Sequence, residues 1–456
     1  MHQHYKYSNY KSLLKPLLFW EEIEKNIIDT YTPPKHFIKQ IEVNEIDELI
    51  NKQIKNYNKM TKENLEETLK FLFNNYREFL YFRIRDNLIE SYHIYNYDYK
   101  NDWAKDLKTF NNKEFKHFYF EYLKVLKRPF MKYDQLESWY TNNCILSMTD
   151  YSKKYGLPTS YISEILDMLE YTKNKFNGIP DCDLIINRKD FPLLTLDRTP
   201  SYSNIYSKSK NMNQPRNPWI ICSQCKTLNH FDINFPTADE WKSFSEDTQM
   251  QTDWSKKYET AIWRGSSTGC GTNIKNNKRL NLANISHKWK TDNRYNSNNN
   301  IDKKPYLDVG ITNFVKRLKV MNQTIYYLNP KDLNFYLSKR MEMKDQTYCK
   351  YIFNIEGNVA AYRYSTLFAS NSVILNIKSK YYLWFEPLLK DKDFIEVKED
   401  FDENYIADTI TYLKKNDEYA RNIASNGVAF YNKYINKNKI SEYWYKLLTK
   451  VNFLQI

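Results

Sequence analysis

Apolar residues recur every three or four positions through much of the first third of the chain. This spacing is that of one face of an α-helix. Residues 43–54 and 115–126 show it, and it is clearest in a stripe of large side chains: Leu65, Leu69, Leu72, Tyr76, Phe79 and Phe82. The pattern predicts a helical N-terminal region over residues 1–150, in which the aromatic stripe forms part of a core.

The pattern changes after residue 175 to short apolar runs between turn residues. Six runs are candidate strands, at residues 183–187, 218–222, 260–263, 351–355, 372–377 and 394–397. Several of them alternate with helical patterns, which cover residues 360–369, 405–413 and 418–431. Such alternation is typical of βαβ units and parallel sheets. We therefore predict an α/β fold with two doubly wound domains, and a surface loop at the asparagine-rich stretch 293–305.

The composition indicates a folded protein but does not indicate which kind of molecule it binds. Hydrophobic residues make up 41% of the 456 positions and aromatic residues 16%, which is typical of a folded protein. The net charge of +13 suits nucleic acid, an acidic membrane surface or small anionic substrates. The excess of Lys accompanies many Asn, Ile and Tyr residues, which AT-rich codons supply, so codon bias explains the charge equally well. Because the chain has only 8 glycines, each glycine is expected to lie where the backbone needs a positive φ angle or where another group approaches it closely.

Neither a secretory leader nor a membrane span is visible in the sequence. The first apolar run, residues 12–20, is interrupted by Lys15 and Pro16, and no run approaches the ~18 residues that cross a bilayer. Six scattered cysteines suit a reducing compartment. Cys222 and Cys225 have CxxC spacing, but no second pair completes a zinc site. We expect a soluble, cytoplasmic protein.

Two predicted strands end in turns that suit an anion. The run 260–263 leads into RGSSTG (264–269), which combines a cation, two glycines and three hydroxyl groups. The run ending at Ile355 leads into a turn around Gly357 and a predicted helix that contains Arg363. A helix start offers free N–H groups, glycine lets a ligand approach the backbone, and arginine binds phosphate through two hydrogen bonds.

Ligands of open α/β sheets bind beyond the carboxyl ends of the strands, where both turns are predicted to lie. We therefore expect the two turns to bind one diphosphate between them. The alternative is that the turn around Gly357 is an ordinary βα turn and that Arg363 is a surface arginine. The GxxxxGK pattern of a P-loop is absent, and no GxGxxG opens a helix. Cations would then neutralise the charge that a metal neutralises elsewhere.

Six blocks in a fixed order carry a resemblance to a known family. They are IPDCDLIINRKDFP (179–192), SQCKTLNHFDINFP (223–236), WRGSSTG (263–269), KYIFNIEGNVAAYRYSTLFASNSVILN (350–376), YYLWFEPLL (381–389) and IASNGVAFYNKYI (423–435). Their order and spacing over residues 175–450 resemble glycosyltransferase family 90, which contains lipopolysaccharide-modifying enzymes, protein O-glucosyltransferases and capsule xylosyltransferases. The resemblance covers little of residues 1–150.

The resemblance implies a GT-B architecture, with two Rossmann-like domains facing a cleft. Residues 151–255 would form the acceptor side, and residues 256–456 the UDP-sugar-binding domain with the C-terminal helices. Family members invert the anomeric centre and need no metal or other cofactor. The implied reaction moves a sugar, glucose or xylose, from a UDP-sugar to a hydroxyl group of a glycan or protein, with neither nucleic acid nor a membrane span involved.

The resemblance also implies roles for particular residues. Asp190, in the RKDFP segment, would be the general base that takes the proton of the acceptor hydroxyl; without the resemblance it would be a turn-capping residue. The implied donor-site residues follow the two turns: Arg264, Gly265, Ser266, Thr268, Arg279, Gly357, Ala360 and Arg363. Arg279, Arg363 and the helix start after Gly357 would stabilise the charge on the departing UDP.

Two cysteine positions depart from the family pattern. Cys349 matches a cysteine that secretory relatives use in a disulfide, but Ser370 stands at the partner position. Cys225 stands where relatives usually show serine. These departures favour a relative that works in a reducing compartment, where disulfide-folded EGF-like acceptors are absent. An AT-rich large DNA virus or protist that makes its own surface glycans fits the composition.

Two rival readings remain at the level of sequence. Asp181 and Asp183 spell D-x-D, the carboxylate pair that chelates Mn²⁺ or Mg²⁺ in a metal-dependent GT-A transferase. That motif ordinarily ends an apolar strand, whereas here the apolar residues 184–186 follow it. The second rival is a basic nucleic-acid-binding protein with tyrosine stacking platforms. Its Lys residues are spread along the chain without an arginine-rich face.

Overall fold

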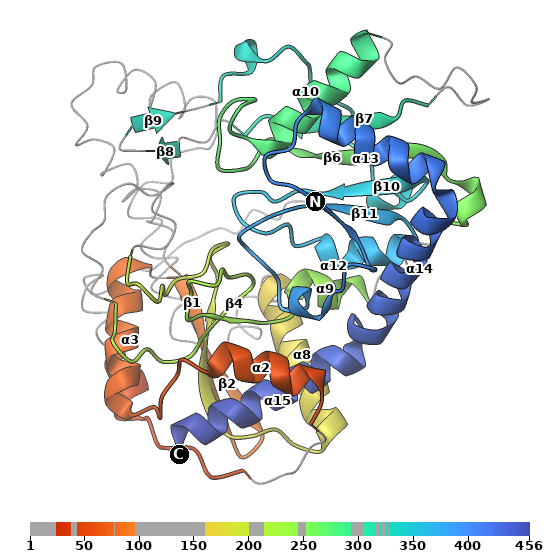
Figure 1. Cartoon of the computed structure of the whole chain (residues 1–456). Helices are drawn as coiled ribbons and strands as arrows, with labels where there is room; N and C mark the ends of the chain where they lie inside the picture. Colours follow the sequence, from red (N-terminus) through yellow and green to blue (C-terminus); the bar gives the residue numbers. More distant parts are fainter. Residues whose placement is uncertain are drawn as a thin grey trace, which may run out of the picture.

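Two five-stranded sheets organise the molecule (Figure 1). The computed structural model describes residues 24–37, 43–76, 78–95, 160–199, 214–244, 252–292, 304–315, 319–321, 324–326 and 328–456. No helix in these ranges is long and apolar enough to cross a membrane. The predicted loop at 293–305 and the predicted helix at 115–126 lie wholly or mostly outside them. The prediction of an α/β fold with parallel sheets is confirmed.

The first sheet has the strand order β2-β1-β3-β4-β5. Its strands are β1 (Glu78–Arg85), β2 (Leu88–Tyr95), β3 (Cys182–Asn187), β4 (Ile221–Ser223) and β5 (Ile233–Asn234). β1 is antiparallel to both β2 and β3, whereas β3, β4 and β5 are parallel. Every residue of β3 is buried, as expected of a parallel strand that is covered on both faces.

Among the described residues, the helices of the first half include α2 (Glu45–Ile54), α3 (Lys62–Asn75), α8 (Ser160–Phe176) and α9 (Ala238–Ser243). The last helix of the chain, α15 (Lys437–Gln455), returns to this half and packs on α8, β3 and α2. Figure 1 shows α14 running down one side of the molecule from the second sheet, and α15 crossing the lower part of the first half toward the C-terminus.

The prediction of a helical N-terminal region is correct for α2 and α3 but wrong for residues 78–95, which form the β1–β2 hairpin. Phe79 and Phe82 have helical spacing, but the residues between them are also apolar, and all four are fully buried. A continuous aromatic run of this kind fits a buried strand as well as a helix. Asp86 and Asn87 join the strands with positive φ angles, the backbone of a tight hairpin turn.

The second sheet is entirely parallel, in the order β12-β11-β10-β6-β7. Its strands are β6 (Tyr258–Ser266), β7 (Leu307–Asn313), β10 (Cys349–Asn354), β11 (Val373–Ile377) and β12 (Ile395–Val397). The surrounding elements are α10 (Lys278–Thr291), α11 (Met343–Gln346), α12 (Tyr364–Leu367), α13 (Glu403–Lys415) and α14 (Asp417–Tyr434). A two-stranded ribbon, β8 (Lys319–Met321) and β9 (Thr324–Tyr326), follows β7.

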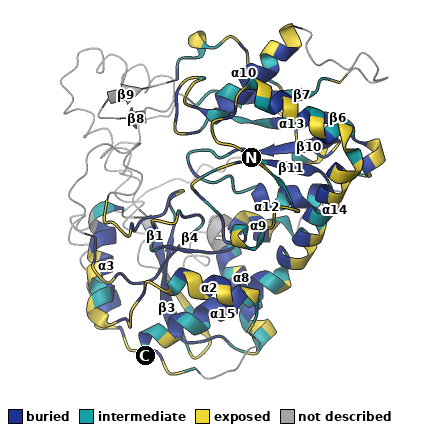
Figure 2. Ribbon diagram, viewed as in Figure 1, coloured by how far each residue is buried: buried dark blue, intermediate teal, exposed yellow. Residues whose placement is uncertain are grey.

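The two halves share one apolar core. Ile262, Ile352 and Ile374 lie in central strands of the second sheet and belong to the buried cluster of the first half. Their chain neighbours Trp263 and Tyr351 belong to a second cluster under α10 and α13. Alternate residues of a strand point to opposite faces, so the second sheet is buried on both sides. Figure 2 shows these buried strands between helices whose outer faces are exposed.

Candidate active site

The second sheet has a topological switch between β6 and β10. The chain runs from β6 through α10 to β7 on one side, and later enters β10 on the other side of β6. Ligands of open α/β sheets bind in the crevice where the strand order reverses, beyond the carboxyl ends of the two strands. The turns after β6 and β10 are the two turns that the sequence predicts to hold a diphosphate.

Arg279, the second residue of α10, joins these two turns. Its acceptors come from both: the carbonyl groups of Ser266 (3.0 Å), Ile355 (2.9 Å) and Glu356 (2.8 Å), and the hydroxyl group of Thr268. A further bond runs from the Gly269 N–H to the side-chain oxygen of Asn358 (3.2 Å). The structure therefore places the turns side by side, as the sequence predicts.

The site concentrates positive charge in a desolvated place. Arg279 and Arg363 lie over the same indole ring, that of Trp263, at 5.1 and 5.4 Å from its centre. Burial, with the Arg363 cation as a second cause, lowers the pKa of Arg279 to about 9. Burial likewise lowers the pKa of Arg363 to about 10. Each guanidinium is therefore held where its charged form is disfavoured until an anion is present.

No described carboxylate forms an ion pair with either arginine. Glu356, whose backbone carbonyl group binds Arg279, has its carboxylate paired with Lys278 (2.6 Å) instead. Arg363 donates to the carbonyl group of Arg264 (3.0 Å), a neutral acceptor. A buried cation without a counterion is costly, and an anionic ligand removes that cost. This arrangement is what a diphosphate site requires.

Arg264 has a different environment from the other two arginines. It pairs with Asp308 of β7 at 2.7 Å and also donates to the Asp308 carbonyl group (2.6 Å). Lys290 binds the second oxygen of the same carboxylate at 2.6 Å. The Arg264 side chain thus ties β6 to β7, in agreement with a role in organising the turn.

The predicted small residues account for the close packing of the turns. A Cβ atom on Gly357 would lie 3.1 Å from the Thr268 hydroxyl and 3.2 Å from Nη2 of Arg279. A Cβ atom on Gly265 would lie 2.6 Å from the Trp263 ring. Ser266 contributes its carbonyl to Arg279, and Ala360 is a partly buried residue that packs against the shared core.

The helix after Gly357 is shorter than predicted. The expected helix at 360–369 is reduced to α12 and a 3₁₀ turn at Phe368–Ser370. Arg363 occupies the N-cap position of α12, so the chain between Gly357 and Arg363 is not helical. A four-residue helix has too few aligned peptides for a large dipole. The predicted start of this helix at residue 360 is therefore wrong, because α12 begins at Tyr364 and Arg363 precedes it rather than lying inside it.

Asp190 lies in the first half of the molecule, three residues after the carboxyl end of β3, and is exposed. Its carbonyl group accepts a hydrogen bond from the Tyr362 hydroxyl of the second half (2.6 Å). The Cys225 thiol donates to the same carbonyl group at 3.3 Å. Because Tyr362 precedes Arg363 in the chain, this bond ties the backbone of the Asp190 turn to the segment that carries Arg363.

The D-x-D pair belongs to the scaffold. Asp183 is fully buried in β3, where Arg83 binds it at 3.1 Å and Arg85 and Tyr81 bind the same carboxylate. Asp181 accepts from the Asp86 N–H at 2.8 Å. Both residues lie at the amino end of β3, the end opposite Asp190. The Asp183 carboxylate and one Asp181 oxygen bind the β1–β2 hairpin, and the described residues contain no cluster of three or more potential metal ligands from His, Cys, Asp and Glu.

Cys222 and Cys225 are also structural. Both are fully buried, and burial raises the pKa of the Cys225 thiol to about 12. Cys349 is a buried thiol and forms no disulfide. The predicted partner position, Ser370, is linked differently: the Lys257 ammonium group donates to the Ser370 carbonyl group at 2.9 Å.

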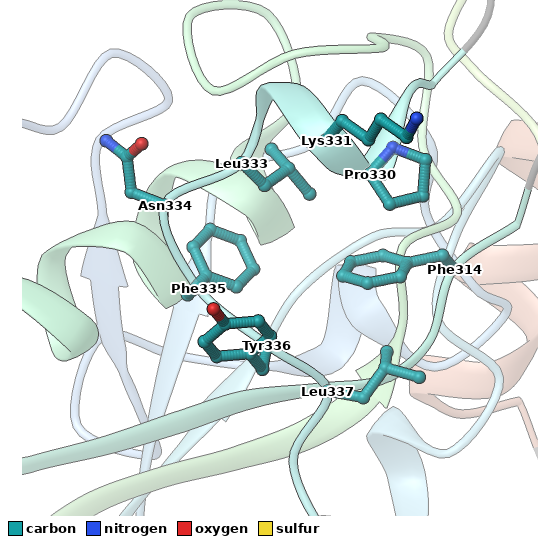
Figure 3. Close-up of a pocket in the computed structure, with 8 residues that line it drawn as sticks. All are labelled: Phe314, Pro330, Lys331, Leu333, Asn334, Phe335, Tyr336 and Leu337. Carbon is teal, nitrogen blue, oxygen red and sulfur yellow. The ribbon is translucent and has the colours of Figure 1, made fainter.

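An aromatic pocket beyond β7 was not predicted. Its volume is about 750 Å³, and Figure 3 shows the residues that line it: Phe314, Pro330, Lys331, Leu333, Asn334, Phe335, Tyr336 and Leu337. It adjoins the β6 turn through β7, because the Ser267 N–H binds the Asn313 carbonyl group (3.0 Å) next to Phe314. None of the predicted site residues lines it. The segment 330–337 has no clear period, which explains why the sequence analysis missed it.

Comparison with known proteins identifies the class to which this fold and site belong. Residues 137–455 match the model of glycosyl transferase family 90, so the chain belongs to this family.

Relatives come from viruses and animals. The chain is 27% identical to uncharacterized protein 179R of invertebrate iridescent virus 6, covering 84% of this chain and 37% of that protein. It is 26% identical to mouse protein O-glucosyltransferase 3, covering 60% of this chain and 47% of the mouse protein. It is 25% identical to bovine protein O-glucosyltransferase 1, covering 60% and 62%. The chain thus spans less than two thirds of the length of each of these relatives.

Proposed function

We propose that the protein is an inverting, metal-independent glycosyltransferase with a GT-B arrangement. It moves a sugar from a UDP-sugar to a hydroxyl group of a glycan or protein. The observation that carries this proposal is the pair Arg279 and Arg363, which lies at the switch point of the second sheet and forms no ion pair with a carboxylate of the described residues. The proposal is supported by the bond from Tyr362, the residue before Arg363, to the backbone carbonyl group of Asp190 (2.6 Å).

In the proposed reaction, Asp190 activates the acceptor. A sugar or serine hydroxyl is a weak nucleophile at neutral pH, so its proton must leave as it attacks the anomeric carbon. Asp190 is exposed and belongs to the half opposite the arginines. It therefore takes the proton on the side of the sugar that faces away from UDP, which gives inversion at the anomeric centre.

The arginines act on the leaving group. Negative charge grows on the diphosphate as the glycosidic bond breaks, and preorganised cations in a desolvated site stabilise that charge strongly. Arg279 and Arg363 supply this stabilisation in our proposal, while Thr268 and Ser266 line the turn beside them. Since α12 is short, the helix dipole is a minor contributor.

Glucose is the first candidate for the transferred sugar, and xylose is the second. The named animal relatives are protein O-glucosyltransferases, which favours glucose and a protein hydroxyl group. We also propose that the enzyme works in a reducing compartment such as the cytoplasm. The Lys257 bonds to Ser370 and Ser372 (3.0 Å) hold the segment that a disulfide would otherwise hold.

The direct test is to incubate the protein with a panel of UDP-sugars and simple glycoside or peptide acceptors, and to measure released UDP. Release from UDP-glucose above the other donors, with an inverted product, supports the proposal. Binding to oligonucleotides that weakens steeply with salt, without UDP release, would support the nucleic-acid reading instead.

Removal of metal is expected to leave activity intact. EDTA should not lower UDP release, because two arginines replace the metal and Asp183 is occupied by Arg83 and Arg85. The measurement compares initial rates before and after EDTA treatment, with Mn²⁺ added back to a parallel sample. Loss of turnover in EDTA and its recovery with Mn²⁺ would contradict metal independence.

Arg363→Ala is expected to weaken UDP binding by about 1.5 to 3 kcal/mol, the usual worth of a charge-assisted hydrogen bond. Titration calorimetry with UDP measures the change. Arg340→Ala is the matched control, because Arg340 is an arginine of the same half that is 83% exposed and lies beside Glu342. Equal UDP affinity in folded Arg363→Ala and in wild type would remove Arg363 from the site.

A further inference from the structure

The carbonyl group of Asp190 accepts a hydrogen bond that joins the two halves of the molecule next to the site. We propose that Tyr362 is a positioning residue, whose hydroxyl group holds the Asp190 turn at its working distance from the donor arginines. This inference rests on the proposed function, in which Asp190 is the base. Tyr362 itself touches neither the reacting hydroxyl group nor the diphosphate in this proposal.

The contacts at this oxygen come from two directions. The Tyr362 hydroxyl donates to it at 2.6 Å, and the Cys225 thiol donates at 3.3 Å. The thiol and the phenol lie 3.8 Å apart. Cys225 follows β4 in the first half, whereas Tyr362 lies in the turn that precedes α12 of the second half. Of these two bonds to the Asp190 carbonyl group, the one from Tyr362 joins the first half to the second.

The rest of the Asp190 turn is braced from within its own half. The Asn187 side chain accepts from the Lys189 N–H (2.7 Å) and donates to the Phe191 carbonyl group (2.7 Å), which are the neighbours of Asp190 on either side. Asn187 also donates to the hydroxyl group of Ser223 (2.9 Å), which is anchored on Asp232 (2.6 Å). The turn is thus shaped by the first half and connected to the second through Tyr362.

Tyr362 is also the chain neighbour of Arg363, the donor-site residue with which it would align the Asp190 turn. Arg363 follows it directly and is fixed by its bond to the Arg264 carbonyl group and by the Trp263 ring. The same segment therefore carries the arginine that binds the diphosphate and the phenol that holds the Asp190 turn, so the position of the base is fixed relative to the diphosphate. Since an error of about 1 Å in the reacting geometry lowers a rate by roughly 100-fold, such a link has a measurable effect on catalysis.

The test compares Tyr362→Phe with wild type, using UDP release from UDP-glucose and UDP affinity by calorimetry on the same preparations. The variant removes one oxygen and keeps the ring. We expect kcat to fall by roughly 10- to 100-fold while UDP affinity and the melting temperature stay close to wild type. The acid limb of the pH–rate profile should not move, because the phenol binds the Asp190 carbonyl group and not its carboxylate.

Tyr382→Phe is the matched control. Tyr382 also lies between the halves, but it connects them through its backbone, which pairs with that of Lys226 (2.9 and 3.2 Å). Its variant should keep the wild-type kcat. Tyr362→Phe combined with Cys225→Ala removes both donors to the Asp190 carbonyl group and should lower kcat further, whereas Cys225→Ser alone should not.

The outcomes separate this inference from the proposed function. If Asp190→Asn abolishes turnover but Tyr362→Phe turns over like wild type, the positioning role is wrong and the base assignment stands. A shifted acid limb, or a parallel loss of UDP affinity and kcat, also contradicts positioning through the carbonyl group. If Asp190→Asn remains active, or wild type releases no UDP from any UDP-sugar, the proposed function fails and this inference fails with it.

Discussion

Asp190→Asn is expected to lower turnover by about 10² to 10⁴-fold, the usual worth of a positioned general base. The substitution keeps the shape of the side chain and removes the proton acceptor. The backbone carbonyl group that binds Tyr362 and Cys225 is retained, so the turn should keep its place. UDP affinity should barely change, because the carboxylate faces the acceptor and not the diphosphate in the proposed reaction.

The measurement is paired: UDP release and UDP-sugar affinity on one preparation, with circular dichroism as the folding control. Asp197→Asn is the matched variant, because Asp197 is an exposed carboxylate of the same half that caps its own turn through Thr199 (2.7 Å) and Asn229 (2.8 Å). It should keep wild-type turnover. Turnover of Asp190→Asn close to wild type would mean that Asp190 is only a turn residue.

Arg279→Met is expected to have the second large effect, on both ligand binding and stability. UDP affinity should fall by about 100-fold or more, since two charge-assisted hydrogen bonds are worth at least about 3 kcal/mol together. The melting temperature should also fall, because the carbonyl groups of Ser266, Ile355 and Glu356 lose their donor. Calorimetry with UDP and thermal unfolding measure the two effects separately.

Two further variants separate the charge of Arg279 from its geometry and control for the loss of a cation from α10. Arg279→Lys keeps the charge but not the planar fork that reaches both turns, so it should retain part of the UDP affinity and little of the stabilisation of the turns. Lys288→Met removes a cation from the same helix, where Lys288 is half-exposed near Glu403, and should change neither quantity. A stable Arg279→Met protein with wild-type UDP affinity would place the diphosphate elsewhere.

Residue patterns alone determined much of the second sheet. The hydrophobic pattern correctly predicted strands β6, β10, β11 and β12 and helices α13 and α14. Each of these elements is long enough or apolar enough for its local residue pattern to identify it. The glycines after β6 and β10 marked the two turns correctly, since close approach of backbone to a neighbour excludes a Cβ atom there. Family resemblance was confirmed over residues 137–455.

The tertiary structure decided which polar residues are partners. Asp183 and Asp190 are seven positions apart, yet Asp183 is buried and paired with Arg83 and Arg85 while Asp190 is exposed. Asp183 is buried because it pairs with β1, a strand about a hundred residues upstream. The helical spacing of the apolar residues in that segment predicted a helix there instead of a strand. Arg264 and Arg363 differ in the same way, because only Arg264 meets a carboxylate on the neighbouring strand.

The long-range connections are likewise invisible in the sequence. The return of α15 to the first half depends on surface that is created by the folding of α2 and α8. The bond from Tyr362 to Asp190 joins residues 172 positions apart, and nothing in either local pattern predicts it. Periodicity reports which face of an element is buried, but the partner on that face is set by how the elements pack, and here that packing determines which charges remain available to a ligand.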